Sequence, residues 1–235
     1  MTRFDMVFFD AGETLLRPHP SFHELFSATC RRAGYEIDVD LVHSVQQRLA
    51  PHLVELAEET GIVAPSLDPA DSLTYWSHLY RRLLGELGIE DEDLIASLYS
   101  TFSSSASYKL YDDALPCLEA LAGAGHRLGL ISNFERWLEE MLVELEVGHH
   151  FEISIISGFV GVEKPDPAIY EAAVRTAGVE PGDAVHIGDS PTMDVEPAAE
   201  VGMTAILLDR WDRYPESRAP RVRSLSAIPA LLANL

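Results

Sequence analysis

Cysteine is scarce in this sequence, which has only Cys30 and Cys117 among its 235 residues. The small disulfide scaffolds of extracellular proteins need more cysteines, so the scarcity excludes such a scaffold and fits a reducing, cytoplasmic location. We therefore expect two buried structural thiols.

Basic residues are also few, with 17 Lys and Arg against 38 Asp and Glu and a formal net charge of −21. A surface of that sign repels nucleic-acid phosphates and anionic lipid headgroups, so neither a nucleic acid nor a membrane is an expected partner. No segment approaches the roughly 20 consecutive apolar residues of a spanning helix, and the N-terminal MTRFDMVFFDAG lacks the pattern of a secretory signal. Low-complexity segments and internal repeats are missing too.

What remains is a globular composition, 47% hydrophobic and 23% charged. The length suits one α/β domain with a large insertion, or two modest domains. We expect the whole chain to fold.

Short apolar runs, each ended by a polar or glycine-containing turn, predict β-strands. They lie at 5–10, 126–132, 152–157, 183–188 and 204–209. Helical patterns separate the last four, which is typical of repeated βα units around a parallel sheet buried on both faces.

The stretch 17–108 has helical patterns throughout. Ser21 and Glu24 form a capping box that opens the first helix, and further helices are predicted. These lie roughly at 40–59, 69–88 and 91–106. The sequence therefore predicts a Rossmann-like α/β core, residues 1–16 and 109–235, with an all-helical domain of residues 17–108 inserted after the first strand.

The segment FFDAGETLL, residues 8–16, places Asp10 at the end of the first predicted strand. Parallel sheets bind ligands at the carboxyl ends of their strands, and the small residues after Asp10 permit close approach to a phosphate. An aspartate that ends a strand is also an ordinary turn residue.

Ser132 and Asn133 follow a second strand. A hydroxyl and an amide there can donate hydrogen bonds to a phosphate or hold its attacking group, although such a pair is also common in loops.

Lys164 lies in the segment GVEKPDP, residues 161–167. Pro165 keeps Lys164 extended, and Asp166 with Pro167 predicts the start of a helix. This places a lysine at the rim of the sheet, where it can neutralise Asp10 and a bound anion; a solvated loop lysine is the alternative.

The segment HIGDSPTMDV, residues 186–195, contains two aspartates, Asp189 and Asp194, in one loop. Clustered carboxylates near a phosphate are the hard oxygen ligands that Mg²⁺ prefers. Capping of the following helix by Asp194 is the alternative, and a metal role does not exclude it.

Taken together, these four segments resemble the motifs of the haloacid dehalogenase-like hydrolase superfamily, in its helical-cap (C1) subfamily. LISNFE and KPDPAIYEAA are most similar to the branch named after haloacid dehalogenase-like hydrolase domain-containing protein 3, also called the rhythmically expressed gene type. The resemblance implies a cap at 17–108 that closes over the site and selects the substrate.

The resemblance also implies roles for the site residues. Asp10 would be the nucleophile of an aspartyl intermediate, Thr14 would support its loop, Ser132 and Asn133 would contact the transferred group, and Lys164 would balance charge. Mg²⁺ would be held by Asp10, the backbone carbonyl of Gly12, Asp189 and Asp194.

The sequence departs from the family pattern at Gly12, where the phosphatases usually have an aspartate that protonates the leaving oxygen and then activates water. General acid–base catalysis is worth about 10²–10⁴-fold in rate. We expect weak or narrow activity, with Glu13, His19 and His23 as candidates to replace the missing acid.

Three functions stay open. The first is a Mg²⁺-dependent phosphatase of a small phosphorylated metabolite. The second is a non-catalytic phosphate- or metal-binding protein on the same fold. The third is a 2-haloacid dehalogenase, whose halide leaves without a proton. The substrate and the choice between a monomer and a homodimer are not defined by the sequence.

Overall fold

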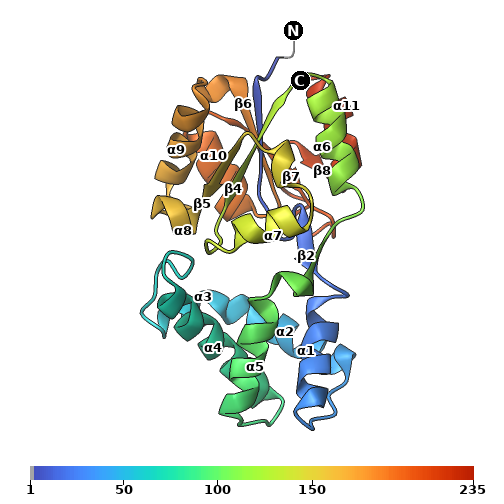
Figure 1. The fold of residues 1–235 in the computed structure, drawn as a ribbon, viewed down its shortest axis with the longest axis vertical. Helices are drawn as coiled ribbons and strands as arrows, with labels where there is room; N and C mark the ends of the chain where they lie inside the picture. The colour runs from blue at the N-terminus through green and yellow to red at the C-terminus, as the bar shows by residue number, and fades with distance from the viewer. Residues whose placement is uncertain (1–2) are drawn as a thin grey trace. The chain divides into compact units, whose positions relative to one another are not determined.

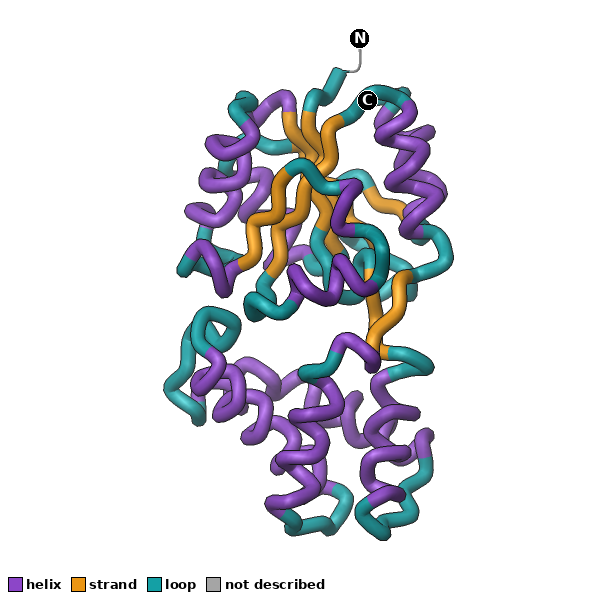
Figure 2. Tube along the Cα trace, in the orientation of Figure 1, coloured by secondary structure: helices purple, strands orange, loops and turns teal. Residues whose placement is uncertain are grey.

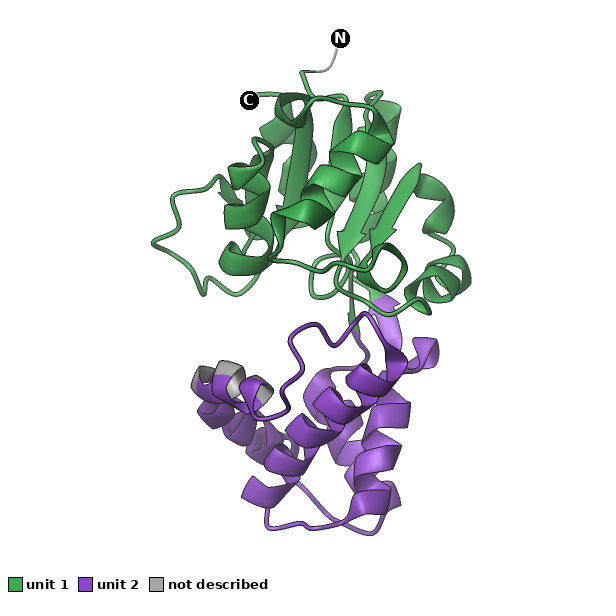
Figure 3. Cartoon of the chain, turned by 90° about the vertical axis from the view of Figure 1, so that its left-hand side faces the viewer, with its two compact units in different colours: residues 1–17, 110–235 green, residues 18–109 purple. Residues whose placement is uncertain are grey.

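The computed structural model describes residues 3–235, without the side chains of residues 51, 53, 54 and 57. The chain forms two compact units, which we call unit 1 and unit 2 (Figure 3). Unit 1 consists of Met1–Arg17 and Leu110–Leu235, and unit 2 consists of Pro18–Lys109. The role of the helical insertion as a cap stays a prediction.

Unit 1 contains a six-stranded parallel sheet in the order β5-β4-β1-β6-β7-β8 (Figure 1). Its strands are β1 (Met6–Phe9), β4 (Arg127–Ser132), β5 (Ile153–Ile156), β6 (Ala184–Gly188), β7 (Thr204–Leu208) and β8 (Arg221–Val222). The parallel α/β core predicted from the sequence is confirmed. The edge strand β8 was not predicted, because two residues carry no periodic pattern.

Helices cover both faces of this sheet (Figure 1). They are α6 (Ala114–Gly123), α7 (Leu138–Glu144), α8 (Ser157–Val160), α9 (Pro167–Ala177), α10 (Glu196–Glu200) and α11 (Ile228–Leu232). Met6 and Phe8 of β1 pack into one core cluster with Ile169 and Tyr170 of α9. Since strand side chains alternate between faces, the neighbouring residues of β1 point to the other side, and the whole strand is buried.

Unit 2 is built mainly from helices, drawn purple in Figure 2. They are α1 (Phe22–Arg32), α2 (Val39–Leu49), α3 (Leu53–Glu58), α4 (Pro69–Glu86) and α5 (Glu92–Phe102), with short 3₁₀ turns at Ala50–His52 and Ser105–Ser107. Their apolar faces meet in a core of their own, which includes Phe26, Val42 and Leu98. Ser21 caps α1 by accepting a hydrogen bond from the backbone N–H of Glu24 at 3.2 Å, as predicted.

Two details of the helical prediction are wrong. The helix expected over 40–59 is divided at residues 50–52, where Pro51 has no backbone N–H to donate. The ends of the stretch 17–108 are not helical: β2 (Leu16–Pro18) and β3 (Tyr108–Leu110) pair in a two-stranded sheet. Pro18 and Pro20 disfavour a helix there.

Both cysteines are buried free thiols, as expected. Burial raises the pKa of Cys30 to about 11 and that of Cys117 to about 12. Among the described residues, no helix has the length and apolar character needed to cross a membrane.

Candidate active site

Two aspartates follow neighbouring strands at the centre of the sheet. Asp10 comes after β1 and Asp189 after β6, and these strands pair in parallel with Phe9 opposite Ile187. From β1 the chain continues outward to β4 and β5 and then returns to β6 on the other side. The order of strands therefore reverses between β1 and β6, where open parallel sheets bind their ligands.

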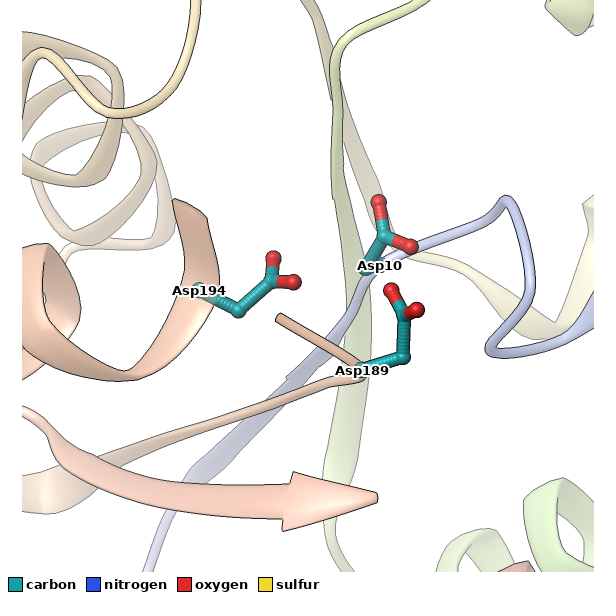
Figure 4. Close-up of side chains that lie close together, drawn as sticks. All are labelled: Asp10, Asp189 and Asp194. Atoms are coloured by element: carbon teal, nitrogen blue, oxygen red, sulfur yellow. The ribbon is translucent and has the colours of Figure 1, made fainter. Parts of the chain in front are cut away.

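Asp194 completes a cluster of three carboxylates. One oxygen from each of Asp10, Asp189 and Asp194 lies within 4.8 Å of the others. Figure 4 shows the three side chains turned toward a common space. Asp10 and Asp194 are buried, and buried carboxylates of one sign require a compensating cation.

Lys164 supplies part of that compensation. Its Nζ donates to Oδ1 of Asp10 and to Oδ1 of Asp194, at 2.7 Å each. Burial would lower the pKa of this lysine, but the charges of Asp10 and Asp194 outweigh burial and raise it. The ammonium group is therefore kept charged between the two carboxylates.

Asn133 fixes the backbone of Lys164. The Asn133 amide donates to the Lys164 carbonyl at 2.7 Å, and its side-chain oxygen accepts the Lys164 N–H at 2.6 Å. Asp166 caps α9 by accepting from the N–H of Ala168 at 2.9 Å, with Pro167 as the first helical residue, as the sequence predicts. The residues after β4 thus hold the lysine in place, and contact of Asn133 with a transferred group stays a prediction.

Asp194 does not cap a helix. It lies within a π-helical turn, Pro191–Val195, that Ser190 caps by accepting from Met193 N–H at 3.2 Å. The Asp194 carboxylate instead faces Lys164, the ring Nε2 of His186 at 3.0 Å and the N–H of Ser190 at 3.1 Å. Burial opposes ionisation, but Lys164 and His186 hold the pKa of Asp194 below its ordinary value.

Gly188 makes room for this carboxylate. A Cβ atom at position 188 would overlap the side chain of Asp194, so any larger residue would displace the acid. The glycine of the HIGD segment is therefore required by close packing against Asp194.

Asp189 has the least compensated charge of the cluster. Burial raises its pKa to about 8, and the negative charges of Asp10 and Asp194 act in the same direction. Burial also raises the pKa of Asp10, against the opposing charge of Lys164. Three clustered carboxylates beside a single ammonium group fit a divalent cation, because a cation would favour the ionised form of Asp189.

Ser132 and Thr14 complete the predicted set. The Ser132 hydroxyl donates to Oδ1 of Asp10 at 3.4 Å, a long hydrogen bond. Thr14 is fully buried, and its hydroxyl has no hydrogen-bond partner among the residues that the structure describes. Ser132 is the last residue of β4 and Thr14 lies on the loop after β1, and their chemical roles stay predictions.

Position 12, where the phosphatases of the family usually have an acid, has free space around it. A Cβ atom at Gly12 would meet no atom within 4 Å, so the backbone does not require a glycine there. Glu13 has a left-handed backbone with φ 55°, and its carboxylate accepts the Tyr111 hydroxyl at 2.7 Å. His19 and His23 belong to unit 2, where His23 is hydrogen-bonded to Gln46.

The sequence prediction missed His186 and Tyr170. His186 is fully buried beside Asp194, and its ring packs in a T-shaped arrangement with that of Tyr170, with centroids 5.2 Å apart. The Tyr170 hydroxyl donates to the carbonyl of Met193 in the π-helical turn. A polar residue inside the apolar run DAVHIG was a usable signal for His186, because buried strands rarely contain one without a partner.

The chain is similar to known proteins over most of its length. The family model for haloacid dehalogenase-like hydrolases matches residues 4–202. Haloacid dehalogenase-like hydrolase domain-containing protein 3 from Bos taurus is 33% identical over 98% of this chain and 93% of its own length. Phosphoserine phosphatase from Thermus thermophilus is 29% identical over 91% of this chain and 92% of its own.

Among solved structures, the magnesium-bound HAD-hydrolase YfnB from Bacillus subtilis aligns with a TM-score of 0.78 over 98% of this chain and 99% of its own, at 17% identity. At that identity the likeness concerns the fold alone.

Proposed function

Since this chain belongs to the haloacid dehalogenase-like hydrolase family, we propose that it hydrolyses the phosphate ester of a small metabolite, through an aspartyl intermediate on Asp10. One observation carries the proposal: the Asp10 carboxylate lies at the switch point of the sheet, 2.7 Å from the buried ammonium group of Lys164. Relatives of similar length include phosphatases, which supports hydrolysis of a phosphate ester over the other reactions of the family.

We propose Mg²⁺ as the cofactor. Asp10, Asp189, Asp194 and the backbone carbonyl of Gly12 are the oxygen ligands available to it, and the raised pKa of Asp189 supports a cation at this place. Bound Mg²⁺ would neutralise the oxygens of the phosphate during in-line transfer.

The residues of the chain then have separable tasks. Asp10 attacks phosphorus, and the bond from phosphorus to the leaving oxygen breaks. Lys164 and Ser132 hold the Asp10 carboxylate, and Asn133 holds Lys164 through its backbone. Water then attacks the phosphorus of the aspartyl phosphate, which releases phosphate and restores the carboxylate.

Gly12 limits this reaction in our proposal. Without an acid at this position, the leaving oxygen takes its proton from solvent, so esters with good leaving groups react fastest. Activity is therefore weak or narrow, and the helices of unit 2 select the substrate as a cap.

The absence of an acid at Gly12 also fits two functions other than a phosphatase. A binding protein without turnover would keep Asp10, Lys164, Asp189 and Asp194 but would not need an acid. A 2-haloacid dehalogenase would need none either, since halide leaves unprotonated; the paired aspartates of the HIGDSPTMDV segment favour a metal and so the phosphatase.

The test is steady-state release of phosphate from an aryl phosphate and from a panel of metabolite phosphates, with and without Mg²⁺. Asp10→Asn is the variant, and Asp183→Asn, an exposed aspartate ahead of β6, is the matched control. We expect Mg²⁺-dependent turnover that Asp10→Asn abolishes and Asp183→Asn preserves. If no phosphate is released under any condition, the phosphatase proposal is wrong, and release of halide from 2-haloacids separates the remaining two.

A further inference from the structure

The loop between β1 and β2, residues 10–15, is held from outside by two residues that no family motif includes. Tyr111 follows β3, and Arg210 follows β7. Together they contact three consecutive residues of the loop, at positions 13, 14 and 15.

Tyr111 makes two of these contacts. Its hydroxyl donates to Oε2 of Glu13 at 2.7 Å, and its backbone N–H donates to the carbonyl of Leu15 at 2.9 Å. The Tyr111 ring is itself fixed, because the guanidinium carbon of Arg210 lies 3.8 Å from the ring centroid. A cation stacked so closely on a tyrosine orients both side chains.

Arg210 makes the third contact. One Nη2–H donates to the carbonyl of Thr14 at 2.9 Å. The guanidinium also binds both oxygens of Asp113 at 2.9 Å each, and Asp113 in turn accepts from the Ser224 hydroxyl and the Leu225 N–H. Arg210 therefore joins the loop to a rigid network, since a two-pronged pairing with a carboxylate fixes the plane of the guanidinium.

The loop needs such support because of its backbone. Glu13 has the left-handed conformation that side chains other than glycine rarely adopt, and the turn closes through N–H groups of Leu15 and Leu16 that both donate to Ala11. An unusual conformation of this kind persists only when its surroundings hold it, and it is found preferentially at functional sites.

The charge of the Glu13 carboxylate also acts on the acidic cluster. The negative charge of Glu13 is among those that raise the pKa of Asp189. Two residues of the loop thus act on the site: Asp10 belongs to the cluster, and the charge of Glu13, which is bound to Tyr111, acts on Asp189.

We propose that Tyr111 and Arg210 are positioning residues: they lock the 10–15 loop through Glu13, Thr14 and Leu15, so that Asp10 and the Gly12 carbonyl keep the geometry that phosphoryl transfer needs. The part of this inference that concerns transfer rests on the function proposed above. Misplacement of a reacting group by about 1 Å is enough to cost on the order of 10²-fold in rate.

The experiment compares Tyr111→Phe and Arg210→Met with the native chain. Tyr111→Phe removes one hydroxyl and keeps the ring, so it is expected to fold. Tyr214→Phe and Arg213→Met, at exposed positions of the segment after β7, are the matched controls. Hydrogen–deuterium exchange of peptides that cover residues 11–16 is the first measurement, because the N–H groups of Glu13, Leu15 and Leu16 are protected by bonds within the turn.

We expect exchange in this loop to become at least fivefold faster in both variants, with exchange in β6 and in both controls unchanged. In the hydrolysis assay we expect kcat to fall about tenfold for Tyr111→Phe and up to about a hundredfold for Arg210→Met, with KM changed less than twofold. Arg210→Lys can keep the ion pair with Asp113 but has no second N–H group placed to reach the Thr14 carbonyl. This variant should have the melting temperature of the native chain but a lower kcat.

Unchanged exchange in the loop overturns the inference. The inference is also overturned if kcat falls only in those variants whose melting temperature falls as well. If the native chain releases no phosphate, the proposed function is wrong, and the exchange measurement alone still decides whether Tyr111 and Arg210 order the loop.

Discussion

The Lys164 ammonium group lies 2.7 Å from the Asp10 carboxylate, although the two residues are 154 positions apart in the sequence. Both side chains are buried, and the same nitrogen is bonded to Asp194. One cation therefore serves two acids that reach the site from different loops, and its loss would leave both unpaired.

Lys164→Met should destabilise the protein strongly without metal. Removal of one partner of a buried ion pair typically costs about 3–5 kcal/mol, because the remaining charge stays buried and unpaired. Unfolding in urea, with and without Mg²⁺, is the measurement. The chain has one other lysine, Lys109, which is exposed, so Lys109→Met is the control. An equal decrease in the free energy of unfolding in Lys164→Met and Lys109→Met would contradict the compensating role of Lys164.

Gly12→Asp should increase phosphatase activity. The position has an ordinary backbone, and a Cβ atom placed there meets only open space, so the substitution is expected to fold. If the missing acid limits turnover, kcat should rise roughly tenfold or more for metabolite phosphates and less for an activated aryl phosphate. Gly12→Asn, of the same size but without the acid, is the control. A rise of the same size for Gly12→Asn would show that proton transfer is not the cause.

The stability of the metal-free protein should fall as the pH rises from about 5 to 8. The pKa of Asp189 is about 8 in the folded chain, because burial and the neighbouring carboxylates raise it, against an ordinary value of 3.8. Between these values the folded state holds a proton that the unfolded state has released, so the free energy of unfolding decreases with rising pH. Thermal melting across this range is the measurement.

Asp189→Asn should remove most of that dependence and should make the protein more stable than the native chain at pH 8 without metal. Mg²⁺ should raise the melting temperature of the native chain at pH 8 and have little effect on the variant. A native melting temperature that stays constant from pH 5 to 8 would contradict the assignment.

Gly188→Ala should weaken Mg²⁺ binding because it displaces Asp194. The added methyl group overlaps the Asp194 side chain, so Asp194 must move away from Lys164 and His186. Overpacking of this kind costs about 1–3 kcal/mol, and we expect weaker Mg²⁺ binding in titration calorimetry. Gly182→Ala, where a new Cβ would meet no atom within 4 Å, is the control. Native affinity in Gly188→Ala would show that the position of Asp194 does not matter for the metal.

The sequence predicts this sheet well because its strands are buried on both faces and read as continuous apolar runs. Asp10, Ser132 and Asp189 could be placed together for the same reason, since each ends or directly follows a strand and parallel strands end at one edge. Neither the sequence pattern nor family membership assigns a chemical task to any single side chain.

The finer geometry could not be predicted, because it depends on local turns and on contacts between distant residues. The sequence leaves Asp194 as a metal ligand or a helix cap, and only the π-helical turn directs it toward Lys164. The sequence gives Glu13 as a candidate acid without a direction for its side chain, and in the structure this residue has a left-handed backbone and accepts a hydrogen bond from Tyr111, which is 98 positions later. Hydrophobic periodicity carries no information about either direction.

The place of β1 in the sheet has a consequence for the order in which the protein forms. Met6 pairs with Arg127 on one side and with Ala184 on the other. During synthesis, β1 must therefore wait for both of its neighbours in the sheet, which come later in the chain, while unit 2 has a core drawn from one continuous segment. We expect the helical insertion to fold first, and the closure of a long loop around it to limit the rate at which Asp10 meets Lys164 and Asp189.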